Sequence, residues 1–324
     1  MSKASHPRKI SSSATLSTPA KVTFTSRGYK LAGHFYPPVI DSPARSGAAV
    51  VIAHPWTSVK EHPPTHYARV LSQAGFYCLA YDAAYQGESE GELRYLEDPG
   101  QRVEVIKSAV TYLVSRDEID SEKIGVLGIC ASGGYVSFAA QTDLRIKAVA
   151  ISAGVCSGTM ARRGLDKDGS NLDMLRTQLE AAARDRNSDV TGEKVDIIHM
   201  LLDEFDPATA SIEMPQSFRD LASYYCTSRA TATHPRVPNL CLPRSWDIMG
   251  NFDAFTWNQL ISPRPFLAIT GTKAASKWYS EDAVAKAKEP KELLVIDGLT
   301  HADLYDNVEV AGPKLNEFFG KYLV

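Results

Sequence analysis

The sequence predicts an α/β fold: a mostly parallel sheet flanked by helices, with a helical cap inserted after the sixth strand. Short apolar runs alternate with amphipathic segments along most of the chain, which is typical of parallel strands joined by right-handed helical crossovers. One of these runs ends in a turn of small residues that opens a helix. The alternation stops over residues 155–250. We therefore expect a core of residues 21–154 and 251–324, with residues 155–250 as the cap.

The core follows a segment, residues 1–20, that is rich in Ser, Thr and Pro and carries no acidic residue. This composition predicts a disordered tail. Lys21–Ser26 and Tyr29–Tyr36 then have the pattern of two antiparallel strands that turn at Arg27-Gly28.

The rest of the core is predicted to consist of buried strands and the helices between them. The expected strands are Ala48–Ala53, Phe76–Tyr81, Ile124–Ile129, Ile146–Ala153, Phe266–Thr270 and Glu292–Ile296. The expected helices are His66–Ala74, Gln101–Arg116 and Ala311–Tyr322. Because ligands of such sheets bind beyond the carboxyl ends of the strands, the residues that follow each strand are the candidates for a site.

The segment 155–250 contains three expected helices, Asn171–Asp185, Val195–Phe205 and Met214–Ser228, and then a passage rich in proline. An insertion at the carboxyl end of a strand is placed to shape a pocket and to exclude water from it. We interpret it as a cap over an active site; a helical subdomain with only a structural role is the alternative.

The turn after Ile124–Ile129 carries the first candidate for chemistry. Cys130 ends the strand, with Gly128 two residues before it and Ser132 two residues after it. This is the layout of a nucleophile elbow, a strained turn that lifts one side chain above the sheet. Two alternatives remain: a shifted register with Ser132 as the nucleophile, which would make the strand too long, and a buried cysteine with only a packing role.

The second candidate is His301, in the loop that follows the expected strand Glu292–Ile296. Enzymes with a nucleophile elbow place their histidine after the nucleophile in chain order, so His301 is the expected general base. The loop after Ala48–Ala53 is expected to supply one oxyanion donor, the backbone N–H of Trp56 or Thr57.

Ala131, the residue after the nucleophile, is expected to supply the second oxyanion donor through its backbone N–H. His54 is expected to shape the turn rather than accept a proton. Glu61 could reach the mouth of the site, although a solvated charge is the simpler interpretation.

These motifs resemble the α/β-hydrolases of the dienelactone-hydrolase-like group, and within it a branch with a cysteine elbow that includes fungal polyketide transferases and bacterial relatives. The resemblance is carried by residues 54–61 (His-Pro-Trp-Thr-Ser-Val-Lys-Glu), Tyr81-Asp82, residues 87–91, the Cys130 elbow, residues 261–265 and residues 298–306. It extends from Lys21 to the C-terminus and is weaker across the cap. It implies Cys130 as nucleophile and His301 as base.

The acid of the expected catalytic triad is the weakest assignment. Hydrolases of this fold commonly have an aspartate at the position that Ala274 occupies here. Asp253 is the preferred candidate because it opens a helix at the expected catalytic edge of the sheet, and Glu281 and Asp282 are the other two. Each of them could simply cap a helix. A Cys/His pair depends on the acid less than a Ser/His pair does, because it already forms a reactive thiolate.

These residues predict an acyl-transfer enzyme, a hydrolase or acyltransferase acting on thioesters, esters or lactones. Transfer of an acyl group between two thiols is nearly isoenergetic, so a cysteine nucleophile suits thioesters and activated lactones. The large cap favours a bulky, polyketide-like acyl group, free or bound to a carrier as a thioester. The alternatives are a dienelactone-type hydrolase of small lactones or esters, and a ligand-binding protein without catalysis.

Composition argues against several other functional classes. The formal charge of −3 indicates neither nucleic-acid nor membrane binding, and no apolar run is long enough to span a bilayer. The N-terminus lacks the apolar core of a signal peptide. Five cysteines without metal-like spacing predict a reducing, cytoplasmic environment without disulfides. We expect no cofactor and no metal, and the oligomeric state stays open.

Overall fold

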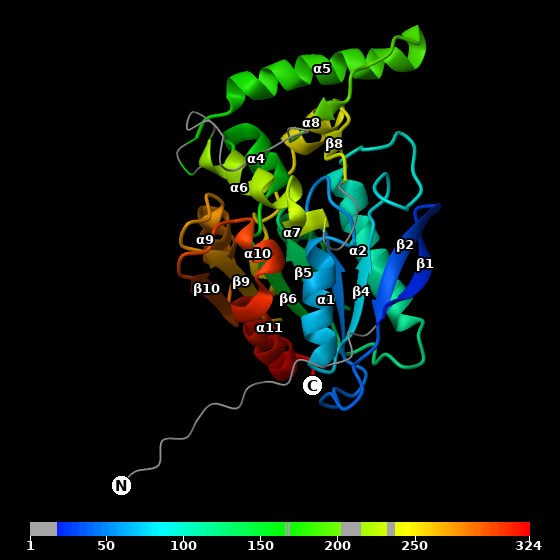
Figure 1. Ribbon diagram of the computed structural model, residues 1–324, viewed down its shortest axis with the longest axis vertical. Helices are drawn as coiled ribbons and strands as arrows, with labels where there is room; N and C mark the ends of the chain where they lie inside the picture. Colours follow the sequence, from blue (N-terminus) through cyan, green and yellow to red (C-terminus); the bar gives the residue numbers. More distant parts are fainter. Residues whose placement is uncertain (1–17, 166, 168, 202–214, 232–236) are drawn as a thin grey trace.

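The computed structural model describes residues 18–165, 167, 169–201, 215–231 and 237–324 (Figure 1). Residues 1–17 of the predicted tail lie outside these ranges, and Ala20 already belongs to the first strand. The core is an eight-stranded sheet with the order β1-β2-β4-β3-β5-β6-β9-β10. β2 pairs antiparallel with β1 and β4, and all other pairs are parallel. The predicted fold class is therefore confirmed.

The strands agree with the prediction to within about two residues at either end. They are β1 Ala20–Ser26, β2 Tyr29–Tyr36, β3 Ala49–Ala53, β4 Tyr77–Tyr81, β5 Ile124–Ile129, β6 Ala148–Ser152, β9 Phe266–Gly271 and β10 Lys291–Ile296. β3, β5, β6 and β9 are buried along their whole length. Strands covered on both faces need apolar residues at every position, which is why they appear in the sequence as continuous apolar runs.

Helices cover both faces of the sheet. One face carries α2 (Pro99–Val114), α3 (Ser132–Thr142) and α9 (Lys277–Lys286), whose apolar residues share a core with the sheet. The other face carries α1 (Pro63–Gln73) and α11 (Val308–Tyr322). α1 begins earlier than predicted because Pro63 and Pro64 occupy its first turn, where proline is favoured. None of the helices in the described ranges is long and apolar enough to cross a membrane.

The cap enters after β6 and returns to the sheet before β9. Its elements are α4 Ser157–Arg163, α5 Leu172–Thr191, β7 Ile198–His199, α6 Gln216–Tyr225, α7 Ser228–Thr231, β8 Leu240–Cys241 and α8 Ser245–Gly250. Figure 1 shows α5 as the element farthest from the sheet, with α6 and α7 between it and the core. A small apolar cluster of its own, which includes Leu175 and Trp246, holds the cap together.

The predictions within the cap were partly wrong. Residues 195–201 of the expected helix Val195–Phe205 are not helical: Ile198 pairs with Cys241 in a short antiparallel ladder. Residues 202–205 lie outside the described ranges. Cys241, the partner of Ile198, is distant in sequence, so no local pattern could reveal this pairing. Met214–Ser228 contains α6, which ends at Tyr225, and the start of α7.

Candidate active site

The strand β5 and the helix α3 place Cys130 at a sharp turn above the sheet. Cys130 has a left-handed backbone with φ of +56°, a conformation that costs free energy in a residue with a side chain. Hydrogen bonds from Cys130 N to Ser152 O and from Val155 N to Cys130 O, 3.0 and 2.9 Å long, fix the turn against the end of β6. The strained turn and its support are the geometry expected of a nucleophile elbow.

The glycines around the turn are required by close backbone contacts. A Cβ at Gly128 would lie 2.2 Å from the carbonyl oxygen of Ser132, and one at Gly133 would lie 2.5 Å from Gly154 Cα. Ser132 is the first residue of α3 and is fully buried. The structure thus places Cys130 at the centre of the elbow, with Ser132 inside the helix that follows.

His301 lies against Cys130 from the loop after β10, and the two side chains form a hydrogen bond. His301 is buried, and its other contacts hold both ring nitrogens: Nδ1 is 2.5 Å from Ser276 Oγ and Nε2 is 3.1 Å from Tyr305 Oη. Tyr305, on α10 (Asp303–Asp306), also bonds to the Cys130 sulfur. The nucleophile and base candidates are therefore adjacent.

The pKa values of the two side chains are shifted in opposite directions. Burial acts to raise the pKa of Cys130, but the His301 charge, the bonds from His301 and Tyr305 and the Ala131 amide outweigh it, so this pKa is lowered. Burial likewise acts to lower the pKa of His301, and the charge of Cys130 outweighs it, so this pKa is raised. Shifts in opposite directions are expected when each ion stabilises the other.

The two expected oxyanion donors come from the elbow and from the turn after β3. The backbone N–H of Ala131 is among the groups that lower the pKa of the Cys130 thiol. Trp56 and Thr57 lie in the turn that follows β3, where Thr57 has φ of +56° and Ser58 N donates to Pro55 O. The cap holds this turn, because Asn239 Nδ2 donates to Thr57 O at 3.1 Å. We call residues 54–61 the oxyanion loop.

His54 braces the oxyanion loop to the elbow. Its Nε2 accepts from Ala83 N, so its Nδ1 carries the proton and donates to Pro55 O at 2.7 Å. Burial, and then the charge of Arg102, lower the pKa of His54 well below its usual value. The carbonyl of His54 accepts bonds from Arg102 Nη2 and Ser132 Oγ, both 2.9 Å or shorter. His54 is thus a neutral structural residue. With Arg102 and the Ser132 hydroxyl it forms a hydrogen-bonded brace between the oxyanion loop and the elbow.

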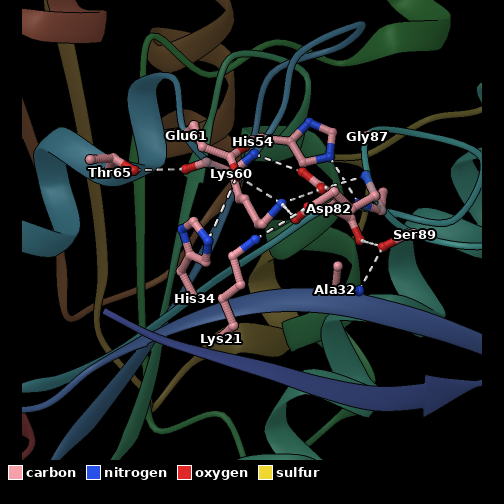
Figure 2. Close-up of polar contacts among 12 residues, drawn as sticks. Lys21, Ala32, His34, His54, Lys60, Glu61, Thr65, Asp82, Gly87 and Ser89 are labelled. Atoms are coloured by element: carbon pink, nitrogen blue, oxygen red, sulfur yellow. Dashed lines mark hydrogen bonds and ion pairs between the residues drawn. The ribbon is translucent and has the colours of Figure 1, made fainter. Parts of the chain in front are cut away.

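A buried ionic cluster fixes the far end of the oxyanion loop (Figure 2). Lys60 is fully buried, and its Nζ lies 2.7 Å from Asp82, 2.7 Å from Glu88 and 2.8 Å from Glu61. Its backbone N also donates to Asp82 Oδ1. Burial alone would lower the pKa of Lys60, but the carboxylates raise it, so the lysine stays charged. This cluster joins the loop to the end of β4.

Three side chains of types that bind metals meet beside this cluster. His34, Glu61 and Glu88 each offer one ligand atom, and these atoms lie within 4.8 Å of one another. The Lys60 ammonium already contacts both glutamates, so a metal ion there would have to compete with a fixed positive charge. We assign no metal or cofactor to these residues.

The structure does not bring the expected acids to His301. Asp253 accepts a bond from Phe255 N, Glu281 pairs with Lys277, and Asp282 pairs with Lys286. Ser276, the N-cap residue of α9, instead contacts His301 Nδ1, and a buried Ala274 occupies the position of the usual aspartate. The sequence reasoning missed Ser276, although a serine at the start of the helix after β9 was the available signal.

Comparison with known proteins gives relatives along nearly the whole chain and others along less than half of it. No protein-family model matches. The uncharacterized protein PA2218 of Pseudomonas aeruginosa is 33% identical over 320 residues, covering 94% of this chain and 80% of the relative. Its crystal structure covers 98% of this chain and 100% of its own with a TM-score of 0.86. These values show common descent over nearly the full length.

Functional names come from shorter matches. Thiohydrolase aneE of Aspergillus aculeatus is 35% identical over 125 residues, 39% of this chain and 38% of that protein. Polyketide transferase claH of Penicillium crustosum is 33% identical over 145 residues, 45% of each chain. The structure of the α/β hydrolase GrgF from Penicillium sp. sh18 superposes with a TM-score of 0.77 at 23% identity, over 94% of this chain and 99% of that one, and this likeness shows the fold.

Proposed function

This chain belongs to the α/β-hydrolases and is related to fungal polyketide transferases, and from that premise we propose that it is an acyl-transfer enzyme that works through an acyl-Cys130 intermediate. The observation that carries the proposal is the Cys130–His301 pair at a strained elbow, in which the pKa of the thiol is lowered and that of the imidazole is raised. A cysteine with only a packing role would have its pKa raised by burial, as Cys78 does.

The proposed reaction has two halves. The Cys130 thiolate attacks the acyl carbonyl, and the oxyanion that forms accepts bonds from the N–H groups of Ala131 and of Trp56 or Thr57, each worth roughly 3–4 kcal/mol. The His301 imidazolium gives its proton to the departing thiol or alcohol as the carbonyl re-forms. Neutral His301 then takes a proton from water or an alcohol, which attacks the thioester and releases the acyl group and the Cys130 thiolate.

Several features favour an activated, bulky acyl donor. A thiolate nucleophile suits a thioester, since the bond that forms and the bond that breaks are of the same kind. Two cap tyrosines, Tyr224 and Tyr225, pack on Tyr305 beside the pair, with ring centroids 5.1 and 5.9 Å apart. The names of the fungal relatives, a thiohydrolase and a polyketide transferase, agree with this substrate class.

The test is intact-mass labelling with a panel of acyl thioesters and p-nitrophenyl esters. Wild type is expected to gain one acyl group on Cys130, and Cys130→Ala is expected to gain none and to lose turnover by about a thousandfold or more. Cys156→Ala, which removes another buried thiol near the elbow, is the matched control and should label as wild type does. Retained turnover in Cys130→Ala would exclude the assignment.

A ligand-binding protein without catalysis is the second candidate, and the serine in place of the usual acid beside His301 favours it. The same experiment separates the two. Failure of every acyl donor to label Cys130, together with an iodoacetamide rate like that of free cysteine, would support the binding protein.

A further inference from the structure

A buried carboxylate of the cap holds the loop that follows β10 and carries His301, which we call the catalytic loop. Asp220, on α6, accepts a bond from Thr300 Oγ1 at 2.5 Å through one oxygen and from Ala302 N at 3.0 Å through the other. These two residues flank His301 in the sequence. Asp220 is itself buried, so the same carboxylate fixes the backbone on both sides of the histidine.

A second contact from the cap holds the same loop. Arg229, on α7, makes paired bonds to Asp306 at 2.6 and 2.9 Å, contacts Asp303 at 3.3 Å and donates to Ala302 O at 3.0 Å. Among the described residues, the group that the core places at His301 Nδ1 is the neutral hydroxyl of Ser276. The negative charge that usually accompanies a catalytic histidine is therefore absent from that side, whereas the cap brings one close.

We propose that Asp220 is a positioning residue for His301, and this role rests on the proposed function. Asp220 fixes the catalytic loop and supplies, from the cap, the negative charge that the core lacks at Ser276. It follows that the catalytic pair is complete only while α6 is docked on the loop. Asp220 contacts neither ring nitrogen of His301. It acts through its hydrogen bonds to Thr300 and Ala302 and through the electrostatic field of its charge.

The surroundings of His301 support this role. The groups that face it are Cys130 from the elbow, Ser276 from α9, Tyr305 from α10 and Asp220 from α6, with Arg229, Asp303 and Asp306 beyond Ala302. Apart from Cys130, Asp220 is the charged group that helps to raise the pKa of His301. Removing its charge should lower this pKa, so that the imidazolium is lost at a lower pH.

The test uses Asp220→Asn in the full-length protein, because the amide can still bond to Thr300 and Ala302 but carries no charge. Carboxamidomethylation of Cys130 by iodoacetamide is followed by intact mass from pH 4 to 10. The lower inflection of the rate reports formation of the thiolate, and the upper one reports loss of the His301 proton, both as properties of the pair. In the variant the upper inflection is expected to fall by roughly 0.5–1 pH unit.

Three control variants distinguish the loss of the Asp220 charge from a general loosening of the cap. Asp185→Asn removes a second buried cap carboxylate, which binds Arg244 within the cap, and should leave the upper inflection in place. Asp220→Glu keeps the charge and should restore most of the wild-type position. Arg229→Gln weakens the same docking without removing a negative charge and should not lower the inflection. If Asp220→Asn is unstable, Asp220→Ser, which also removes the charge, is measured in its place.

The readout needs no acyl substrate, so it is independent of whether the proposed function holds. An upper inflection that is unchanged in Asp220→Asn, or lowered equally in Arg229→Gln and Asp185→Asn, would overturn the role of Asp220 even if acyl transfer is found. Where an acyl donor is turned over, Asp220→Asn should lower kcat with little change in KM, because the carboxylate acts on the catalytic loop and not on the bound substrate.

Discussion

The two halves of the candidate site are built differently. The nucleophile half, Cys130 with the oxyanion loop, is held mainly by the core: by the ends of β5 and β6, by the His54–Arg102–Ser132 brace and by the Lys60 cluster. The cap adds the bond from Asn239 to Thr57 O. The base half, the His301 loop, is held by Ser276 from the core and by Asp220 and Arg229 from the cap. The nucleophile is thus fixed by the sheet, whereas the base depends on a separate subdomain.

This difference predicts that changes in one half affect stability and activity together, whereas changes in the other affect activity alone. The nucleophile half should lose stability and activity together when its supports are removed, since they are buried in the core. The base half should lose activity while the core stays folded. The following substitutions test this contrast, beginning with the largest expected effect.

His301→Ala removes the base itself and is expected to lower turnover of an acyl donor by about a thousandfold, because neither protonation of the leaving group nor activation of water can then occur at that position. Acyl-Cys130 formed from a strongly activated ester should persist in the variant, which intact mass would show. His66→Ala, on α1, is the control. Equal rates of deacylation in His301→Ala and wild type would remove His301 from the mechanism.

Lys60→Met breaks the core support of the oxyanion loop and leaves Asp82 buried without its counter-ion. We expect the free energy of unfolding to fall by about 3–5 kcal/mol, as for other broken buried ion pairs, with loss of activity in parallel. Urea denaturation measures the change. The matched control is Lys147→Met, whose partner Glu122 is exposed, and it should cost less than about 1 kcal/mol. Similar small losses in both variants would contradict the proposed support.

Ser276→Ala removes the hydroxyl at His301 Nδ1 and keeps the fold. Turnover should fall by roughly tenfold, since one hydrogen bond that orients the imidazole is lost, about 1.4 kcal/mol. Ser280→Ala, also buried on α9, is the control and is expected to keep full activity. A loss in Ser276→Ala as large as that in His301→Ala would mean that the hydroxyl does more than orient the ring.

Ser132→Ala removes one bond to the His54 carbonyl and is expected to cost about 1 kcal/mol of stability, measured by urea denaturation. It also decides between the two registers of the elbow. With Cys130 as nucleophile, the variant should still acquire the acyl label on that cysteine. A label that disappears along with the Ser132 hydroxyl would favour the shifted register.

The sequence alone determined the fold class, the order and extent of the core strands and the elbow with its histidine loop. These features depend on local patterns: continuous apolar runs for strands buried on both faces, and small residues where backbones come too close for a Cβ, as at Gly128 and Gly133. The sequence also located both expected oxyanion donors next to strand ends, because chain topology gathers these ends at one edge of the sheet.

Only the tertiary structure decided what surrounds the histidine. Ser276 and Asp220 reach the His301 loop from 25 and about 80 residues away, and the strand pairing of Ile198 with Cys241 was equally invisible. A serine that opens a helix and an aspartate on a cap helix look like ordinary capping and surface residues in the sequence. Their roles come from long-range packing of the cap on the core, which no local periodicity encodes.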